Sequence, residues 1–202
     1  EQFKAGQFGD IKRDMPYYQA RFHKTLSDKL VGLGYGIKRT ETSFEIEGVP
    51  QKVIDLFSKR TDEIGRIAKE KGITDAKELA ELGARSRAKK QKGHSMTELK
   101  EEWLSQIASL GNTGDEGKAV RYAPDRPKHE LTAEHCLDHA IEHCFERASV
   151  MADRKLLAVA YRHAIGNEGV SLNVIAKQFS EDKRLIHITE NARPMCTTKD
   201  VL

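Results

Sequence analysis

The stretch RLIHITENARPMCTT, residues 184–198, contains two strand-like pieces, RLIHIT and PMCTT, with Glu190 to Arg193 between them. Such a pair of short segments around a polar turn predicts a β-hairpin. Three segments with helical periodicity, near 133–148, 153–165 and 171–180, come directly before it. Three helices followed by a hairpin is the order of a winged helix, so residues 131–202 are predicted to form a winged-helix-like domain. Many such modules bind DNA, although others only pack against neighbours.

Residues 1–110 predict a helical region with one small hairpin. A helix is expected from Pro16 to Leu33, because apolar residues recur there at helical spacing: Tyr18, Phe22, Leu26, Leu30 and Leu33. YGIKRT and SFEIEG follow as two short strands. Further helices are expected from Pro50 to Gly72, from Thr74 or Asp75 to Gly93, and after a capping box of Ser95 and Glu98. The predicted fold class is mainly α with small β-hairpins (α+β).

The segment GNTGDEGKAVRYAPDRPKHE, residues 111–130, holds three glycines, two prolines and many charges. This composition is typical of a linker. We therefore predict two domains, 1–110 and 131–202, joined by the linker 111–130.

Composition narrows the classes of function. The chain is 38% hydrophobic and 32% charged, which favours helices with wide polar faces over a sheet sandwich. Three cysteines without framework spacing favour a reducing cytoplasm, and no apolar run approaches the roughly 18 residues of a membrane span, so no membrane partner is expected. The first residue is Glu1 rather than Met, which suggests a segment of a longer protein.

Residues 57–92 form the most basic part of the sequence. They contain 11 basic and 6 acidic residues, a local charge of +5 in a chain with a net charge of +3. Spread along a helix, such cations suit contacts to a phosphate backbone. The alternative is a solvated helix C-terminus, where Lys and Arg are favoured by the helix dipole. The predicted DNA-binding residues are Lys59, Arg60, Arg85, Arg87, Lys89, Lys90 and Lys92.

Two other motifs are candidate chemical sites. In HCLDHAIEHC, residues 135–144, His135, His139 and His143 step by four, a spacing that can chelate a metal. Without a second cluster, a solvent-facing flank is the better interpretation. The Tyr17–Tyr18 pair is a candidate nucleophile. However, Tyr18 falls on the apolar stripe of its helix and is expected in the core. No catalytic residue, metal ligand or cofactor site is predicted in this chain.

The segment "GVPQKVIDLFSKRTDEIGRIAKEKGITDAKELAELGARSRAKKQK", followed by "TELKEEWLSQIASLG", resembles the C-terminal part of the relaxase domain in TrwC-type (MobF) conjugative relaxases. "YQARFHKTLSDKLVGLGYGIKRTETSFEIEGVP" resembles the helix and hairpin before it. "AIEHCFERASVMADRKLLAVAYRHAIG", with "TTKDVL" at the end, resembles the junction with the helicase half.

The resemblance implies that this chain is the DNA-binding segment of a conjugative relaxase, a tyrosine transesterase that nicks one strand at a transfer origin and is coupled to a helicase. The parent protein would use a divalent metal for nicking and ATP for the helicase. The nucleophile and the metal histidines of the family align with no residue here, so an enzymatic role is expected of the parent protein rather than of this chain. The implied partners are single-stranded DNA near a nick, the rest of a relaxase–helicase and proteins of the conjugation complex. Two alternatives stay open: a stand-alone winged-helix DNA-binding regulator, and a non-catalytic protein-docking module.

Overall fold

A computed structural model of the chain describes residues 8–85, 93–111 and 131–201. Within these ranges the side chains of residues 59–62, 76, 77, 80, 84, 85 and 201 are not described. The chain packs into two compact units: one combines Glu1–Glu47 with Val120–Leu202, and the other holds Gly48–Ala119. Helices dominate the described elements, and the strands form one hairpin and one small antiparallel sheet, which confirms the predicted α+β class. None of the described helices combines the length and apolar character that a bilayer span requires.

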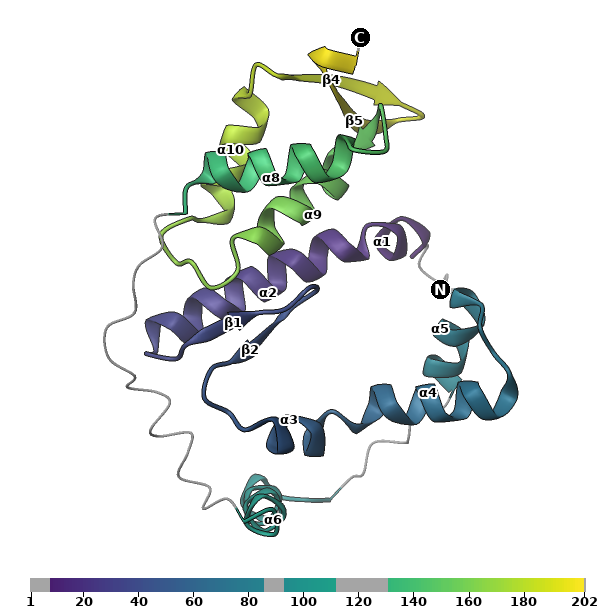
Figure 1. Cartoon of the computed structure of the whole chain (residues 1–202), viewed down its shortest axis with the longest axis vertical. Helices are drawn as coiled ribbons and strands as arrows, with labels where there is room; N and C mark the ends of the chain where they lie inside the picture. Colours follow the sequence, from purple (N-terminus) through teal and green to yellow (C-terminus); the bar gives the residue numbers. More distant parts are fainter. Residues whose placement is uncertain (1–7, 86–92, 112–130, 202) are drawn as a thin grey trace, which may run out of the picture. The chain divides into compact units, whose positions relative to one another are not determined.

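The C-terminal part of the first unit contains three helices and a small sheet (Figure 1). The elements follow in the order α8 (Ala133–Phe145), β3 (Met151–Ala152), α9 (Asp153–His163), α10 (Leu172–Glu181), β4 (Leu185–Glu190), β5 (Arg193–Thr198) and the 3-10 turn η1 (Lys199–Val201). β5 lies between β3 and β4 and is antiparallel to both. The predicted hairpin is confirmed, whereas the two-residue strand β3 was not predicted.

Helix α9 is the centre of this unit. Six consecutive residues, Leu156 to Tyr161, are buried, because α9 contacts α8, α10 and the N-terminal helix α2 (Met15–Gly32). α8 begins at a capping box between Thr132 and His135 and adds Leu137 and Ala140 to the same core. The core thus forms where helices from both ends of the chain meet.

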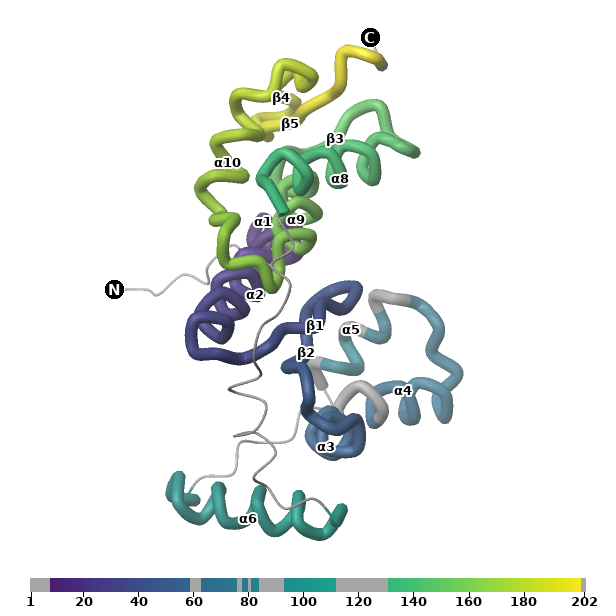
Figure 2. Tube along the Cα trace, turned by 60° about the vertical axis from the view of Figure 1, so that its left-hand side comes forward, coloured from purple at the N-terminus to yellow at the C-terminus, as the bar shows by residue number. Residues whose placement is uncertain are grey.

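Helix α2, preceded by the short α1 (Gly9–Arg13), lies alongside α9 in both views (Figures 1 and 2). This packing joins residues from both sides of the predicted linker into one unit. The division into 1–110, 111–130 and 131–202 stays a prediction about chain order, and most of the linker lies outside the described residues.

The predicted core face of α2 was wrong. The apolar row is largely exposed, with Phe22 at 61% and Tyr18 at 38%, and the buried residues of the helix are Ala20, Lys24 and Ser27. The small side chains of Ala20 and Ser27 let α2 and α9 approach each other. Ser27 also forms a hydrogen bond beyond its own helix, because its hydroxyl accepts from the backbone N–H of Gly166 at 3.2 Å. A tertiary partner, not the apolar periodicity, selected the buried face.

The first hairpin pairs β1 (Ile37–Arg39) with β2 (Phe44–Ile46) in antiparallel register, as predicted. It packs against the loop that follows α9. An ideal Cβ at Gly166 (φ +84°) would lie 3.2 Å from Cγ2 of Ile37, so glycine both adopts the left-handed backbone and leaves room for the hairpin. This contact holds the start of β1 against the loop that follows α9.

The second unit holds four described helices: α3 (Gln51–Phe57), α4 (Lys59–Lys71), α5 (Ala76–Arg85) and α6 (Met96–Ala108). The single helix expected from Pro50 to Gly72 is interrupted at Ser58, which caps both α3 and α4. Gly72 ends α4 in the left-handed conformation, as predicted, at φ +65°. The predicted capping box of Ser95 and Glu98 is confirmed at the start of α6.

The turn between β4 and β5 offers a stability test. Its two residues, Asn191 and Ala192, have φ of 49° and 59°, the pattern of a type I′ turn. Alanine is strained there, so Ala192→Gly should raise the free energy of unfolding by about 0.5–1 kcal/mol. The matched change Asn191→Ala should lower it, because asparagine tolerates this region better than alanine. Urea unfolding of both variants measures the two shifts, and a destabilised Ala192→Gly would contradict this account of the turn.

Candidate functional site

The predicted DNA-binding residues are only partly covered by the structure. Lys59 and Arg60 begin α4 and Arg85 ends α5, but their side chains are not described. The other predicted cations lie outside the described residues: Arg87, Lys89, Lys90 and Lys92. The basic surface of residues 59–92 therefore stays a prediction from the sequence.

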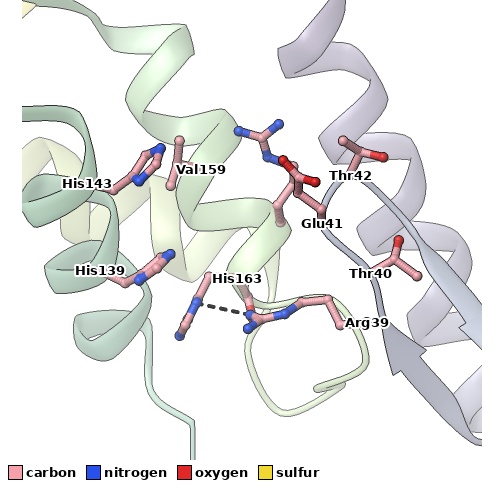
Figure 3. Close-up of a pocket in the computed structure, with 9 residues that line it drawn as sticks. Arg39, Thr40, Glu41, Thr42, His139, His143, Val159 and His163 are labelled. Atoms are coloured by element: carbon pink, nitrogen blue, oxygen red, sulfur yellow. Dashed lines mark hydrogen bonds between the residues drawn. The ribbon is translucent and has the colours of Figure 1, made fainter.

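A pocket of about 480 Å³ lies within the first unit, between the β1–β2 hairpin, α8 and α9 (Figure 3). The hairpin supplies one wall, and the facing helices supply three histidines. The lining residues are Arg39, Thr40, Glu41, Thr42, His139, His143, Val159, Arg162 and His163. Apart from Val159, every one of these side chains is polar or ionisable, so polar groups are available to a ligand in the pocket.

Arg39 and His163 join two walls of the pocket (dashed line in Figure 3). Nη1 of Arg39 lies 3.0 Å from Nδ1 of His163 and donates to the backbone oxygen of the same residue at 2.8 Å. A guanidinium can only donate, so Nδ1 must accept and the proton of the neutral ring must reside on Nε2. The contact fixes both the tautomer and the orientation of His163.

The three histidines of the pocket are close to one another. The rings of His139 and His163 stack with centroids 4.1 Å apart, and His143 stacks on His139 at 6.2 Å. Burial lowers the pKa of His163 to about 4, and His139, Arg39 and His135 add to the shift. Burial also lowers the pKa of His139, with Arg39 and His143 in support and Glu142 in opposition. His163 is therefore neutral near pH 7, held so by burial and by neighbouring positive charge.

Two arginines and one glutamate line the pocket, and these three side chains together carry a charge of +1. The Nη1 atom of Arg39 is used by His163, while its other N–H groups point to no partner among the described residues. Arg162 makes no hydrogen bond or ion pair with any side chain in the described ranges. These donors are available to a ligand.

The three histidines of α8 lie in two different places. His135 is part of the helix cap, where its Nδ1 accepts from the backbone N–H of Thr132 at 3.4 Å, while His139 and His143 line the pocket. In the part of the chain that the structure describes, no group of three or more His, Cys, Asp or Glu side chains is placed to hold a metal ion. The described residues thus do not fit the divalent metal that the family resemblance implies, and no step is derived through one.

Tyr17 and Tyr18 connect α2 to α9. The ring of Tyr17 packs 5.8 Å from that of buried Tyr161, and the hydroxyl of Tyr18 accepts from Nη1 of Arg154 at 3.2 Å. Burial, supported by Tyr17, raises the pKa of Tyr161 to about 12. The expectation that Tyr18 lies in the core was wrong, because Tyr17 is the member of the pair that packs against it.

The sequence did not point to Arg39, Arg162 or His163. Arg39 and His163 are 124 residues apart in the chain, so no local spacing could link them. The only available signal was the pair His139 and His143, whose spacing places both on one side of a helix.

The comparison with protein families found a match to the TrwC relaxase model over residues 1–110. The comparisons with curated proteins and with solved structures each found no match. The matched residues include α2, the β1–β2 hairpin and all described helices of the second unit.

Proposed function

The chain belongs to the TrwC relaxase family, and on this premise we propose that it is the DNA-binding segment of a conjugative relaxase that is coupled to a helicase. In this role it grips single-stranded DNA beside the nick, through the cations of residues 59–92. The tyrosine nucleophile, the divalent metal and the ATP site are assigned to other parts of such a relaxase, and its place of action is the cytoplasm.

The observation that carries the proposal is the family match together with the charge of the matched residues. Within the match, residues 57–92 combine 11 basic with 6 acidic residues, so positive charge concentrates in one segment. Cations along a helix bind a phosphate backbone mainly by releasing condensed counterions, which requires no fixed geometry at the bases. Non-specific binding of a DNA strand, without recognition of its bases, is the function that this segment supports best.

We further propose that residues 131–202 form a winged-helix-like entry to the helicase region. The order α8, β3, α9, α10, β4 and β5 supports this proposal, because it matches the order of helices and wing in that class. The stand-alone regulator is less well supported. Lys177 is the only basic residue of α10, the expected recognition helix, and its Nζ lies 4.0 Å from Glu181.

A specific observation favours the docking module as a second candidate. Exposed apolar side chains follow one another at helical spacing along α1 and α2: Phe8, Ile11, Met15, Tyr18, Phe22 and Leu26. A row of this kind is unusual on a surface that meets only water. Binding to a conjugation protein without affinity for oligonucleotides at low salt would favour this candidate over DNA binding.

The variant Arg85→Glu/Lys89→Glu/Lys90→Glu/Lys92→Glu tests the proposed grip. It should weaken binding of a single-stranded oligonucleotide by at least about tenfold and flatten the dependence of affinity on salt, because fewer phosphates are neutralised. A matched control reverses four exposed cations of the first unit: Lys12, Lys29, Arg147 and Lys155. Fluorescence anisotropy measures both, and an unchanged salt slope in the first variant would refute this role of the segment.

A further inference from the structure

We infer that the pocket between the β1–β2 hairpin, α8 and α9 is a second phosphate site, separate from the basic segment of residues 59–92. Its ligand is a phosphate group, carried by a nucleic-acid strand or free in solution. The strand as a source rests on the proposed function, whereas binding of inorganic phosphate does not.

The donor set of the pocket fits a tetrahedral oxyanion. Arg39 comes from β1 and Arg162 from α9, and Thr40 and Thr42 belong to the hairpin wall. Guanidinium groups and hydroxyls donate to several oxygens of one phosphate at the same time. About 480 Å³ is room for a phosphate together with the sugar or base next to it.

Arg39 is pre-oriented for this task. Its two hydrogen bonds to His163 hold the guanidinium in place from one side, so little rotamer freedom remains to be lost when an anion binds the other N–H groups. Arg162 is half-buried and forms no ion pair with a described side chain, although Glu41 lines the same pocket. A partly desolvated cation attracts an anion more strongly than a solvated one does.

Glu41 is the one carboxylate in the lining and opposes an anion. Glu41 allows a test of the electrostatic argument. Replacing it with glutamine removes the repulsion between its carboxylate and a bound anion and removes no hydrogen-bond donor. The variant Glu41→Gln should therefore bind phosphate more tightly than the unchanged chain.

The histidines link the site to pH. The charged and titratable groups that act on the His163 ring are His139, Arg39 and His135, and the pocket is also lined by Glu41, His143 and Arg162. In the free pocket the pKa of His163 is about 4, below the ordinary 6.5. Protonation of His163 would take place at Nδ1, which accepts from Arg39 in the neutral ring, so it would remove one of the two hydrogen bonds that orient Arg39. The contribution of Arg39 to anion binding should therefore weaken as pH falls through about 4.

The test uses the whole chain and inorganic phosphate at constant ionic strength, with the histidine ring signals followed by NMR. We expect a saturable shift of the His163 signal. Arg162→Gln should weaken the affinity about tenfold, the size of one lost charge-assisted hydrogen bond. Arg147→Gln, at a side chain 90% exposed in the same unit, is the matched control and should change nothing.

Oligonucleotide added to the phosphate-loaded chain distinguishes the two sources. Displacement of phosphate identifies a strand as the ligand, and retention identifies free phosphate. The Glu substitutions at residues 85–92 should leave the phosphate shift intact, so failure of the proposed DNA grip and failure of this pocket are separable. No saturable shift of His163, or equal affinities for Arg162→Gln and Arg147→Gln, would overturn the inference.

Discussion

Replacing Asp28 with alanine should lower the free energy of unfolding of the first unit by about 3–5 kcal/mol, because it leaves the ammonium of Lys24 buried without its counter-ion. The side chain of Lys24 is 0% exposed and its Nζ lies 2.5 Å from the Asp28 carboxylate. The remaining hydrogen bond, from Nζ to the backbone oxygen of Asn167 at 3.1 Å, supplies no negative charge. Urea unfolding measures the loss.

The control for this change is Asp10→Ala. Asp10 also pairs with a cation on its own helix, Arg13, but its side chain is 84% exposed. Exposed pairs of this kind contribute about 0–1 kcal/mol, so the control should be nearly neutral. A loss at Asp28 no larger than that of the control would contradict the buried-charge explanation.

Lys24 and Asp28 should be replaceable together by apolar residues. Burial raises the pKa of Asp28 although the nearby Lys24 acts to lower it, so desolvation opposes the charged pair. Removing both charges removes that cost along with the attraction. The double variant Lys24→Met/Asp28→Leu should therefore recover most of the stability that Asp28→Ala loses.

Leu156→Ala is the second change with a large expected effect. Leu156 is fully buried in α9, the helix that α2, α8 and α10 surround, so truncation leaves a cavity that neighbours on several sides cannot fill. The expected loss of unfolding free energy is about 2–5 kcal/mol. Val174→Ala, at a side chain 53% exposed on α10 of the same unit, should shift stability by less than about 0.5 kcal/mol. Equal effects at the two positions would contradict the central place of α9.

The C-terminal helices and the hairpin of residues 184–198 could be predicted because their signals are local. Helical periodicity, the polar turn at Asn191 and the capping residues before α8 and α10 act within a few residues. Strand β3 carries no such signal, since two residues are too few to show alternation. The break at Ser58 was equally silent, because neither glycine nor proline marks it.

The buried face of α2 could not be read from the sequence. Apolar periodicity identifies a row of side chains but not the partner that covers a row, and here α9 covers the opposite one, with Ala20, Lys24 and Ser27. A buried lysine is not foreseen by any hydrophobic pattern. Its counter-ion Asp28 is four residues away in the same helix. The backbone oxygen that Lys24 also binds belongs to Asn167, 143 residues away.

The pocket shows the same limit. The spacing of His139 and His143 indicates a shared helix flank, but Arg39, which lines the same pocket, comes from the hairpin that packs through Ile37 on Gly166. The predicted basic surface differs from the pocket, because its positive charge is evident from the sequence alone. The side chains of its predicted residues are not described by the structure.

The most direct test of DNA binding by this relaxase-family chain is its affinity for a single-stranded oligonucleotide as a function of salt concentration. The account predicts measurable binding at low salt and a linear fall of the logarithm of affinity with the logarithm of salt concentration, at about 0.7 per neutralised phosphate. With several cations in contact, the slope should have a magnitude of roughly two or more. No binding at low salt, or binding that does not change with salt, would contradict the account.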